Sequence, residues 1–101
     1  SDQYYSTAVL GDLCDLEAHP LINITARKSL TNFDVLYVAV LKNRNGEVIS
    51  RIPQTNSQDR IWLDFIPNEP VFGVYEISFE LSDGNPAFVQ DGMQIGISTL
   101  M

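Results

Sequence analysis

The segment Val74-Tyr75-Glu76-Ile77-Ser78-Phe79-Glu80-Leu81 alternates apolar and polar side chains without a break. Successive side chains of a β-strand point to opposite faces of a sheet, so this pattern predicts a strand with one face on a core and the other in water. The side chains expected to face the core are Tyr75, Ile77, Phe79 and Leu81.

Short apolar runs separated by turn residues continue on both sides of this strand. Their spacing of roughly 8–12 residues is typical of β-sandwiches and barrels, and no stretch of convincing length has a helical period. We therefore predict an all-β, immunoglobulin-like sandwich of about seven antiparallel strands. The other expected strands are Thr7 to Leu13, Leu21 to Arg27, Val35 to Lys42, Glu47 to Ile52, Arg60 to Phe65 and Met93 to Thr99.

Three of these segments carry more detailed predictions. The run from Val35 to Lys42 is apolar almost throughout, which favours the middle of a sheet. In Leu21 to Arg27 and in Arg60 to Phe65, alternate residues are expected to face the core. Asn23 is then expected to face solvent, and Trp62 to lie on the face opposite the core. The predicted inward residues are Ile22, Ile24 and Ala26 in one strand and Ile61, Leu63 and Phe65 in the other.

Turn residues separate the expected strands. Asn45-Gly46 tolerates the positive φ angles of a tight hairpin and joins Val35–Lys42 to the strand after it. Pro53 lacks an N–H donor and is expected to end that strand or to lie at a sheet edge. Gln54 to Asp59 is a polar loop, and Ser82 to Pro86 is dense in turn residues.

Length and charge limit the classes of partner. The 101 residues suffice for one domain, which we place at 1–101 with residues 1–6 flexible. Thirteen acidic and six basic residues give a net charge of −7, and the basic residues do not cluster. Nucleic acid is therefore excluded as a partner, and insertion into a membrane is not expected because no apolar run is long enough.

Two features bear on the compartment. Cys14 is the only cysteine, so the chain forms no internal disulfide, which favours a reducing compartment. Asn23-Ile24-Thr25 is a candidate acceptor for N-glycosylation, which requires a eukaryotic secretory route. We expect an extracellular or cell-surface location.

A proline-containing corner precedes the alternating strand. Pro67 lies in this corner, and Gly73-x-Tyr75 opens the strand. This arrangement is typical of a tyrosine corner, in which the Tyr75 hydroxyl would bond back to the loop backbone. Together with the Asn45-Gly46 hairpin, the pattern from Val35 through Leu81 resembles the macroglobulin-like domains of the alpha-2-macroglobulin and complement group. The resemblance implies a structural and interaction module, and the thioester motif and bait region of the large proteins are absent.

The sequence contains no pattern typical of a catalytic or metal-binding site. His19 is the only histidine and Cys14 lies five residues before it, but no oxyanion-hole signal accompanies the pair. Two acidic sets lie in turns without the spacing of a calcium loop. We therefore predict no enzyme activity, no metal site and no cofactor. The acidic sets are Asp12, Asp15, Glu17 and Asp34, and Asp83 and Asp91.

Exposed aromatic residues and one loop are the candidate contacts for a protein partner. We expect Trp62 to pack under a loop, and the alternative is an exposed anchor. Phe72 and Phe88 lie in turn-rich segments and are either satellite core residues or contacts. The loop residues predicted to bind are Gln54, Asn56, Gln58 and Arg60.

Three functions are compatible with this reading. The first is a noncatalytic protein-interaction or spacer module that binds through loops or through a strand edge, where self-association is also open. The second is a small inhibitor that inserts Pro53 to Arg60 or Pro67 to Phe72 into an enzyme cleft. The third is an accessory domain of a larger membrane or secretory-pathway complex.

Overall fold

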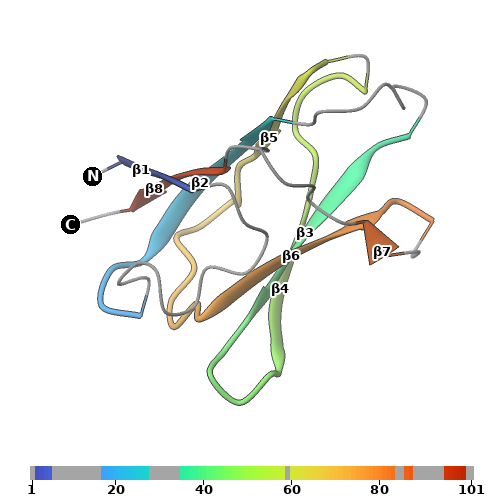
Figure 1. Cartoon of the computed structure of the whole chain (residues 1–101). Helices are drawn as coiled ribbons and strands as arrows, with labels where there is room; N and C mark the ends of the chain where they lie inside the picture. The colour runs from blue at the N-terminus through green and yellow to red at the C-terminus, as the bar shows by residue number, and fades with distance from the viewer. Residues whose placement is uncertain are drawn as a thin grey trace.

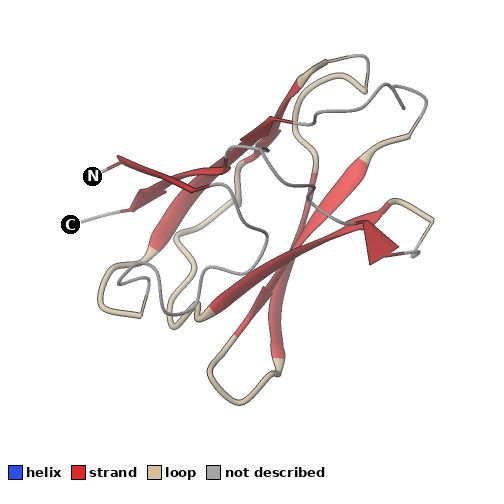
Figure 2. Cartoon of the chain, viewed as in Figure 1, coloured by secondary structure: helices blue, strands red, loops and turns tan. Residues whose placement is uncertain are grey.

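Every regular element in the described part of the chain is a β-strand (Figure 2). The computed structural model describes residues 2–5, 17–27, 35–58, 60–83, 86–87 and 95–99. Within these ranges there is no helix long and apolar enough to cross a membrane. The strands are β1 (Asp2–Tyr5), β2 (Leu21–Arg27), β3 (Tyr37–Lys42), β4 (Val48–Pro53), β5 (Trp62–Phe65), β6 (Glu76–Leu81), β7 (Pro86–Ala87) and β8 (Ile95–Thr99).

The strands form two antiparallel sheets (Figure 1). One sheet has the order β1-β8-β2-β5 and the other the order β4-β3-β6-β7. β1 and the two-residue β7 each lie at one edge of a sheet, and β5 and β4 lie at the opposite edges. β3 lies between β4 and β6, which confirms its predicted central position.

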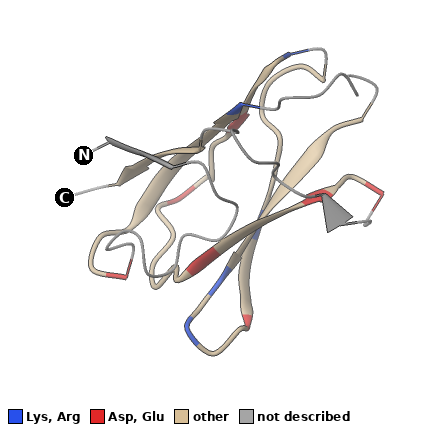
Figure 3. Cartoon of the chain, in the orientation of Figure 1, with Lys and Arg blue, Asp and Glu red and all other residues tan. Residues whose placement is uncertain are grey.

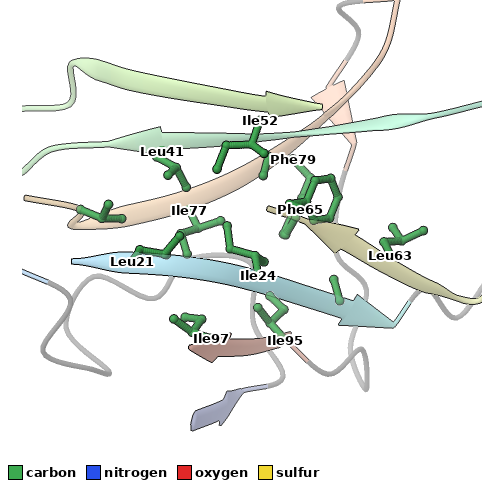
Figure 4. Close-up of a cluster of buried hydrophobic side chains, with 13 residues drawn as sticks. Leu21, Ile24, Leu41, Ile52, Leu63, Phe65, Ile77, Phe79, Ile95 and Ile97 are labelled. Atoms are coloured by element: carbon green, nitrogen blue, oxygen red, sulfur yellow. The ribbon is translucent and has the colours of Figure 1, made fainter. Parts of the chain in front are cut away.

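The core lies between the two sheets (Figure 4). Both sheets contribute apolar side chains, and the rings of Phe65 and Phe79 meet across the interface with centroids 5.4 Å apart. The fold is therefore all-β and sandwich-like, as predicted. The buried cluster is Leu21, Ile24, Ala26, Ala39, Leu41, Ile52, Leu63, Phe65, Val74, Ile77, Phe79, Ile95 and Ile97.

The β3–β4 hairpin forms at the predicted site with a different turn geometry. Gly46 N donates to Asn43 O at 3.0 Å, so Arg44 and Asn45 are the central turn residues and Gly46 follows them with φ +82°. This is a type I turn followed by a left-handed glycine. Asn43 Oδ1 closes the turn by accepting hydrogen bonds from Asn45 N at 3.0 Å and Glu47 N at 2.9 Å.

One inward prediction for β2 is wrong. Ile24 and Ala26 are buried as predicted, but Leu21 is buried and Ile22 is only partly so. The register between β2 and β8 shifts between Leu21 and Asn23, and such an irregularity reverses the alternation on one side of it. Strict alternation therefore fails at the start of β2.

The predicted inward residues of the other two amphipathic strands also need correction. Leu63, Phe65, Ile77 and Phe79 are buried as expected. Ile61 is 48% exposed because it precedes β5, which begins at Trp62 and not at Arg60 as predicted. Tyr75 and Leu81 are partly exposed, and Val74 takes the buried place expected of Tyr75, because regular pairing of β6 begins only at Glu76.

The start of the chain also differs from expectation. The sequence predicts flexible residues 1–6, whereas Asp2–Tyr5 form β1 along β8. The predicted strand Thr7 to Leu13 lies outside the described residues. The described ranges contain eight strands, whereas about seven were predicted for the chain. β1 and the two-residue β7 were not predicted because neither has an alternating pattern of apolar and polar residues.

Candidate interaction surface beside β4

An open groove runs between β4 and the connection from β5 to β6. Its volume is about 880 Å³, within the range common for ligand sites. One wall is the edge strand and the residues after it, and the other wall is the connection that crosses from one sheet to the other. The lining residues are 49–55 and 66–72.

The loop that follows β4 is fastened by its own first residue. Gln54 is 7% exposed, and its backbone N donates to Tyr37 O at 2.9 Å. Its side-chain Oε1 accepts a hydrogen bond from Tyr37 N at 3.2 Å, and Nε2 donates to Ser57 O at 2.9 Å. The amide of Gln54 therefore holds the loop to β3 and is not displayed to a partner.

The next two residues cover the free edge of β5. Thr55 N donates to Asp64 O at 2.6 Å, and the Thr55 hydroxyl accepts a hydrogen bond from Ile66 N at 2.9 Å. Asn56 Oδ1 accepts a hydrogen bond from Asp64 N at 3.0 Å, and Asn56 Nδ2 donates to Trp62 O. Backbone groups that a neighbouring strand would pair are thus satisfied by two side chains and one amide.

Pro53 removes one outward donor from the edge of β4. Because Gln54 N bonds to Tyr37 O, these two residues form a hydrogen-bonded pair, and such pairs alternate along an antiparallel ladder. The nitrogen of Pro53, one residue earlier, therefore faces away from β3, where an N–H would be free to bind another strand. Pro53 ends β4 at a sheet edge as predicted, and the edge offers no donor at this position.

Phe72 projects from a turn that is held on both sides. Val71 and Leu21 exchange two backbone hydrogen bonds of 2.9 and 2.8 Å. Gly73 follows with φ +74°, a conformation that favours glycine, and Val74 is fully buried. Phe72 lies between these anchors and is 72% exposed. A rigid turn therefore displays a large aromatic ring at the rim of the groove.

Neither a known protein family, a curated protein nor a solved structure matches this chain.

Three of the exposed apolar residues gather at the groove. Ile49, Ile66 and Phe72 are 38%, 51% and 72% exposed, and all three line it. Alternation beyond Phe65 would have placed Ile66 outward. No sequence signal identified Ile49, which lies where the register between β3 and β4 shifts, between Ser50 and Val48. The other exposed large apolar residues are Val48, Ile61 and Trp62.

The predicted binding residues divide into two groups. Phe72 borders the groove, whereas Trp62, Gln58 and Arg60 do not. The prediction that Trp62 packs under a loop is wrong: the side chain is 43% exposed, and the guanidinium carbon of Arg27 lies 5.9 Å from its ring centroid. Trp62 points away from the core because Leu63 and Phe65 occupy the inward positions of β5. Asn56 is partly buried, and its side chain forms hydrogen bonds with the edge of β5.

The predicted structural residues lie at corners of the fold. Asn45 and Gly46 form the hairpin turn, and Gly73 has the positive φ angle that its position requires. The Arg44 guanidinium carbon lies 4.4 Å from the ring centroid of Tyr75, so the hairpin contacts this ring. Pro67 is partly exposed and lines the groove. The hydroxyl bond of a tyrosine corner stays a prediction.

Asn23 does not face solvent freely. The residue is partly buried in β2, and its Oδ1 is fully buried without a hydrogen-bond partner among the described residues. Glycosylation at Asn23 stays a prediction.

Several residues considered for chemistry lie outside the described ranges. His19 is partly buried near the start of β2, and Glu17 pairs with Arg44. Among the described residues no group of three or more His, Cys, Asp or Glu side chains is placed to hold a metal ion. The residues outside are Asp12, Cys14, Asp15, Asp34, Asp59, Phe88 and Asp91.

Proposed function

We propose that this domain is a noncatalytic protein-interaction module that binds a partner through the groove beside β4, with Phe72 as the anchor. The observation that carries the proposal is the exposure of Phe72 on a turn fixed by Val71 and Val74. An aromatic ring on an anchored backbone loses little backbone entropy on binding, and aromatic side chains dominate interface energies.

The edges of β4 and β5 beside the groove favour recognition of a partner through side chains over pairing of backbones. Pro53 removes an outward donor from β4, and Thr55 and Asn56 occupy the edge of β5. An extended partner strand would therefore find the outward backbone groups from Trp62 to Ile66 already bonded, and no donor at Pro53. Apolar side chains of a partner would instead enter the groove between Ile49, Ile66 and Phe72.

An immunoglobulin-like relationship is part of the proposal and is supported by strand order. The order β4-β3-β6-β7 corresponds to strands C′, C, F and G of an immunoglobulin sheet, and β2 next to β5 corresponds to B next to E. The difference is β8, which occupies the place beside β2 that the first strand takes in those domains. The macroglobulin-like resemblance stays a proposal within this framework, as does the extracellular or cell-surface location.

Partner capture with matched variants tests the proposal. The immobilised domain, Phe72→Ser and Val48→Ser would be incubated with secreted and cytosolic extracts, and bound proteins quantified by mass spectrometry. Val48 is a suitable control because it is 46% exposed but does not line the groove. A saturable partner retained by Val48→Ser and lost by Phe72→Ser is expected. Identical capture by all three proteins would refute the role of the groove.

A second candidate function is enzyme inhibition by the segment from Pro67 to Phe72. The same displayed ring favours it, because proline-flanked, preorganised loops suit insertion into an enzyme cleft. The segment Gln54 to Ser57 is less suited, since its polar groups are committed to β3 and β5. Assays against a panel of proteases separate the two functions: an inhibitor loses potency with Phe72→Ser, whereas a binding module inhibits none of them.

A further inference from the structure

A second surface with different chemistry surrounds Trp62. Trp62 and Ile61 are 43% and 48% exposed, and Arg27 and Arg60 beside them are exposed as well. Arg27 is the cross-strand neighbour of Trp62, and its guanidinium carbon lies 5.9 Å from the ring centroid. None of these four residues lines the groove beside β4. We call Arg27, Arg60, Ile61 and Trp62 the Trp62 patch.

The arginines of this patch are the unusual feature in an acidic chain. The chain has a net charge of −7, and three of its five described basic side chains have acidic neighbours. Arg44 pairs with Glu17, Arg51 pairs with Glu80, and Lys42 lies opposite Glu76. Arg27 and Arg60 form no ion pair with any residue that the structure describes.

The patch lies apart from the other basic residues. Figure 3 shows basic residues at the end of β2 and before β5, far from the β3–β4 hairpin that holds another basic group. The nearest described acidic residue along β5 is Asp64, one strand repeat beyond Trp62 on the same face, and it is partly buried. Two arginines without an ion-pair partner among the described residues therefore flank an exposed indole.

We propose that the Trp62 patch binds an acidic protein segment that also carries apolar side chains. Carboxylates of the segment would bond to the guanidinium groups of Arg27 and Arg60, whose fork geometry suits them. Its apolar side chains would cover Trp62 and Ile61. The cation–π contact with the indole restricts Arg27 before binding, which reduces the entropy lost when the carboxylate arrives. This inference does not depend on the groove beside β4.

The only tryptophan of the sequence provides the measurement. A short peptide in which glutamates alternate with leucines would be titrated while Trp62 emission is recorded. The control peptide has glutamine in place of glutamate. We expect a saturable blue shift with the acidic peptide and an affinity about tenfold lower for the control, because charge-assisted hydrogen bonds are lost.

Variants of the arginines complete the experiment. Arg27→Gln and Arg60→Gln should each weaken binding of the acidic peptide by about tenfold, while Lys42→Gln should leave it unchanged. Circular dichroism checks that the three variants keep the fold. Equal affinity for the two peptides, or no saturable change in emission, would overturn the proposal. It would also be overturned if a heparin fragment, but not the acidic peptide, bound with the same arginine dependence, since the ligand would then be an anionic glycan.

Discussion

Arg51 and Glu80 form an ion pair that crosses over β3. Arg51 lies on β4 and Glu80 on β6, and Arg51 Nη1 lies 3.0 Å from Glu80 Oε1 and 2.5 Å from Oε2. Between them, Val40 is opposite Arg51 in the register and Val38 is opposite Glu80. Val40 is only 2% exposed although it lies outside the core cluster. The ion pair therefore covers the outer face of the central strand.

This arrangement predicts that the stem of Arg51 matters more than its charge. Arg51→Ala should destabilise the domain by about 1 kcal/mol because it uncovers Val40, whereas Arg51→Met keeps an apolar stem and should cost less. Urea denaturation of both variants, and of each combined with Glu80→Gln, measures the coupling between the charges. A coupling well above about 1 kcal/mol would show that the ion pair itself carries the stability.

Truncation of Phe65 should lower the stability of the domain strongly, whereas truncation of Phe72 should hardly change it. Phe65 is fully buried against Phe79, so Phe65→Ala should cost about 3–5 kcal/mol and leave the domain largely unfolded. Phe72→Ala removes a ring that is 72% exposed and should change stability by less than about 0.5 kcal/mol. Thermal denaturation of the two variants is the test. A large loss from Phe72→Ala would mean that this ring serves the core.

The two positive-φ glycines should resist substitution for a conformational reason. A Cβ at Gly46 or Gly73 would meet no atom within 4 Å, so steric overlap is not the obstacle. Their φ angles of +82° and +74° should nevertheless make alanine cost about 1–2 kcal/mol at each. Asparagine at either position should cost less, because it tolerates the left-handed region. Equal stability of the alanine and asparagine variants would contradict this account.

Asn56→Ala should open the edge of β5. The substitution leaves Asp64 N and Trp62 O without the side-chain partner that covers them. We expect faster hydrogen exchange at the Asp64 amide, with protection of the Ile24 and Ile77 amides unchanged. Greater self-association at high protein concentration should accompany it, since an uncovered edge can pair with another chain. Unchanged exchange at Asp64 would mean that the side chain does not protect the edge.

Tyr37 should make stability depend on alkaline pH. Burial raises the pKa of its hydroxyl above the ordinary value of 10.0, because the charged form is poorly solvated. The folded state then holds this proton more tightly than the unfolded state, so the contribution is fully present below the unfolded pKa and is lost as pH rises through the folded pKa. The free energy of unfolding should therefore fall above about pH 10, and less steeply in Tyr37→Phe. Parallel pH profiles for the two proteins would refute the assignment.

Strands with strong local patterns could be predicted closely, and residues near irregular pairing could not. β2 has the predicted bounds, and Ile77, Phe79, Ile95 and Ile97 are buried as their alternation indicates. Ile22 and Ile61 differ because a register shift and a late strand start interrupt the alternation. Of the candidate site, Phe72 was recognised, but Ile49 and the part played by Gln54 were not.

The sequence alone determined the fold class, the β3–β4 hairpin and the place of Pro53, since side-chain alternation and turn chemistry act between residues that are close along the chain. Only the tertiary structure decided that Asp2–Tyr5 pair with β8 and that Thr55 and Asn56 cover β5. It also decided that Phe72 and Trp62 remain exposed. These outcomes depend on contacts between segments that are distant along the chain. Such segments compete for the same backbone hydrogen-bonding groups and for the same volume in the core. A local sequence pattern does not indicate which segment will occupy a given place.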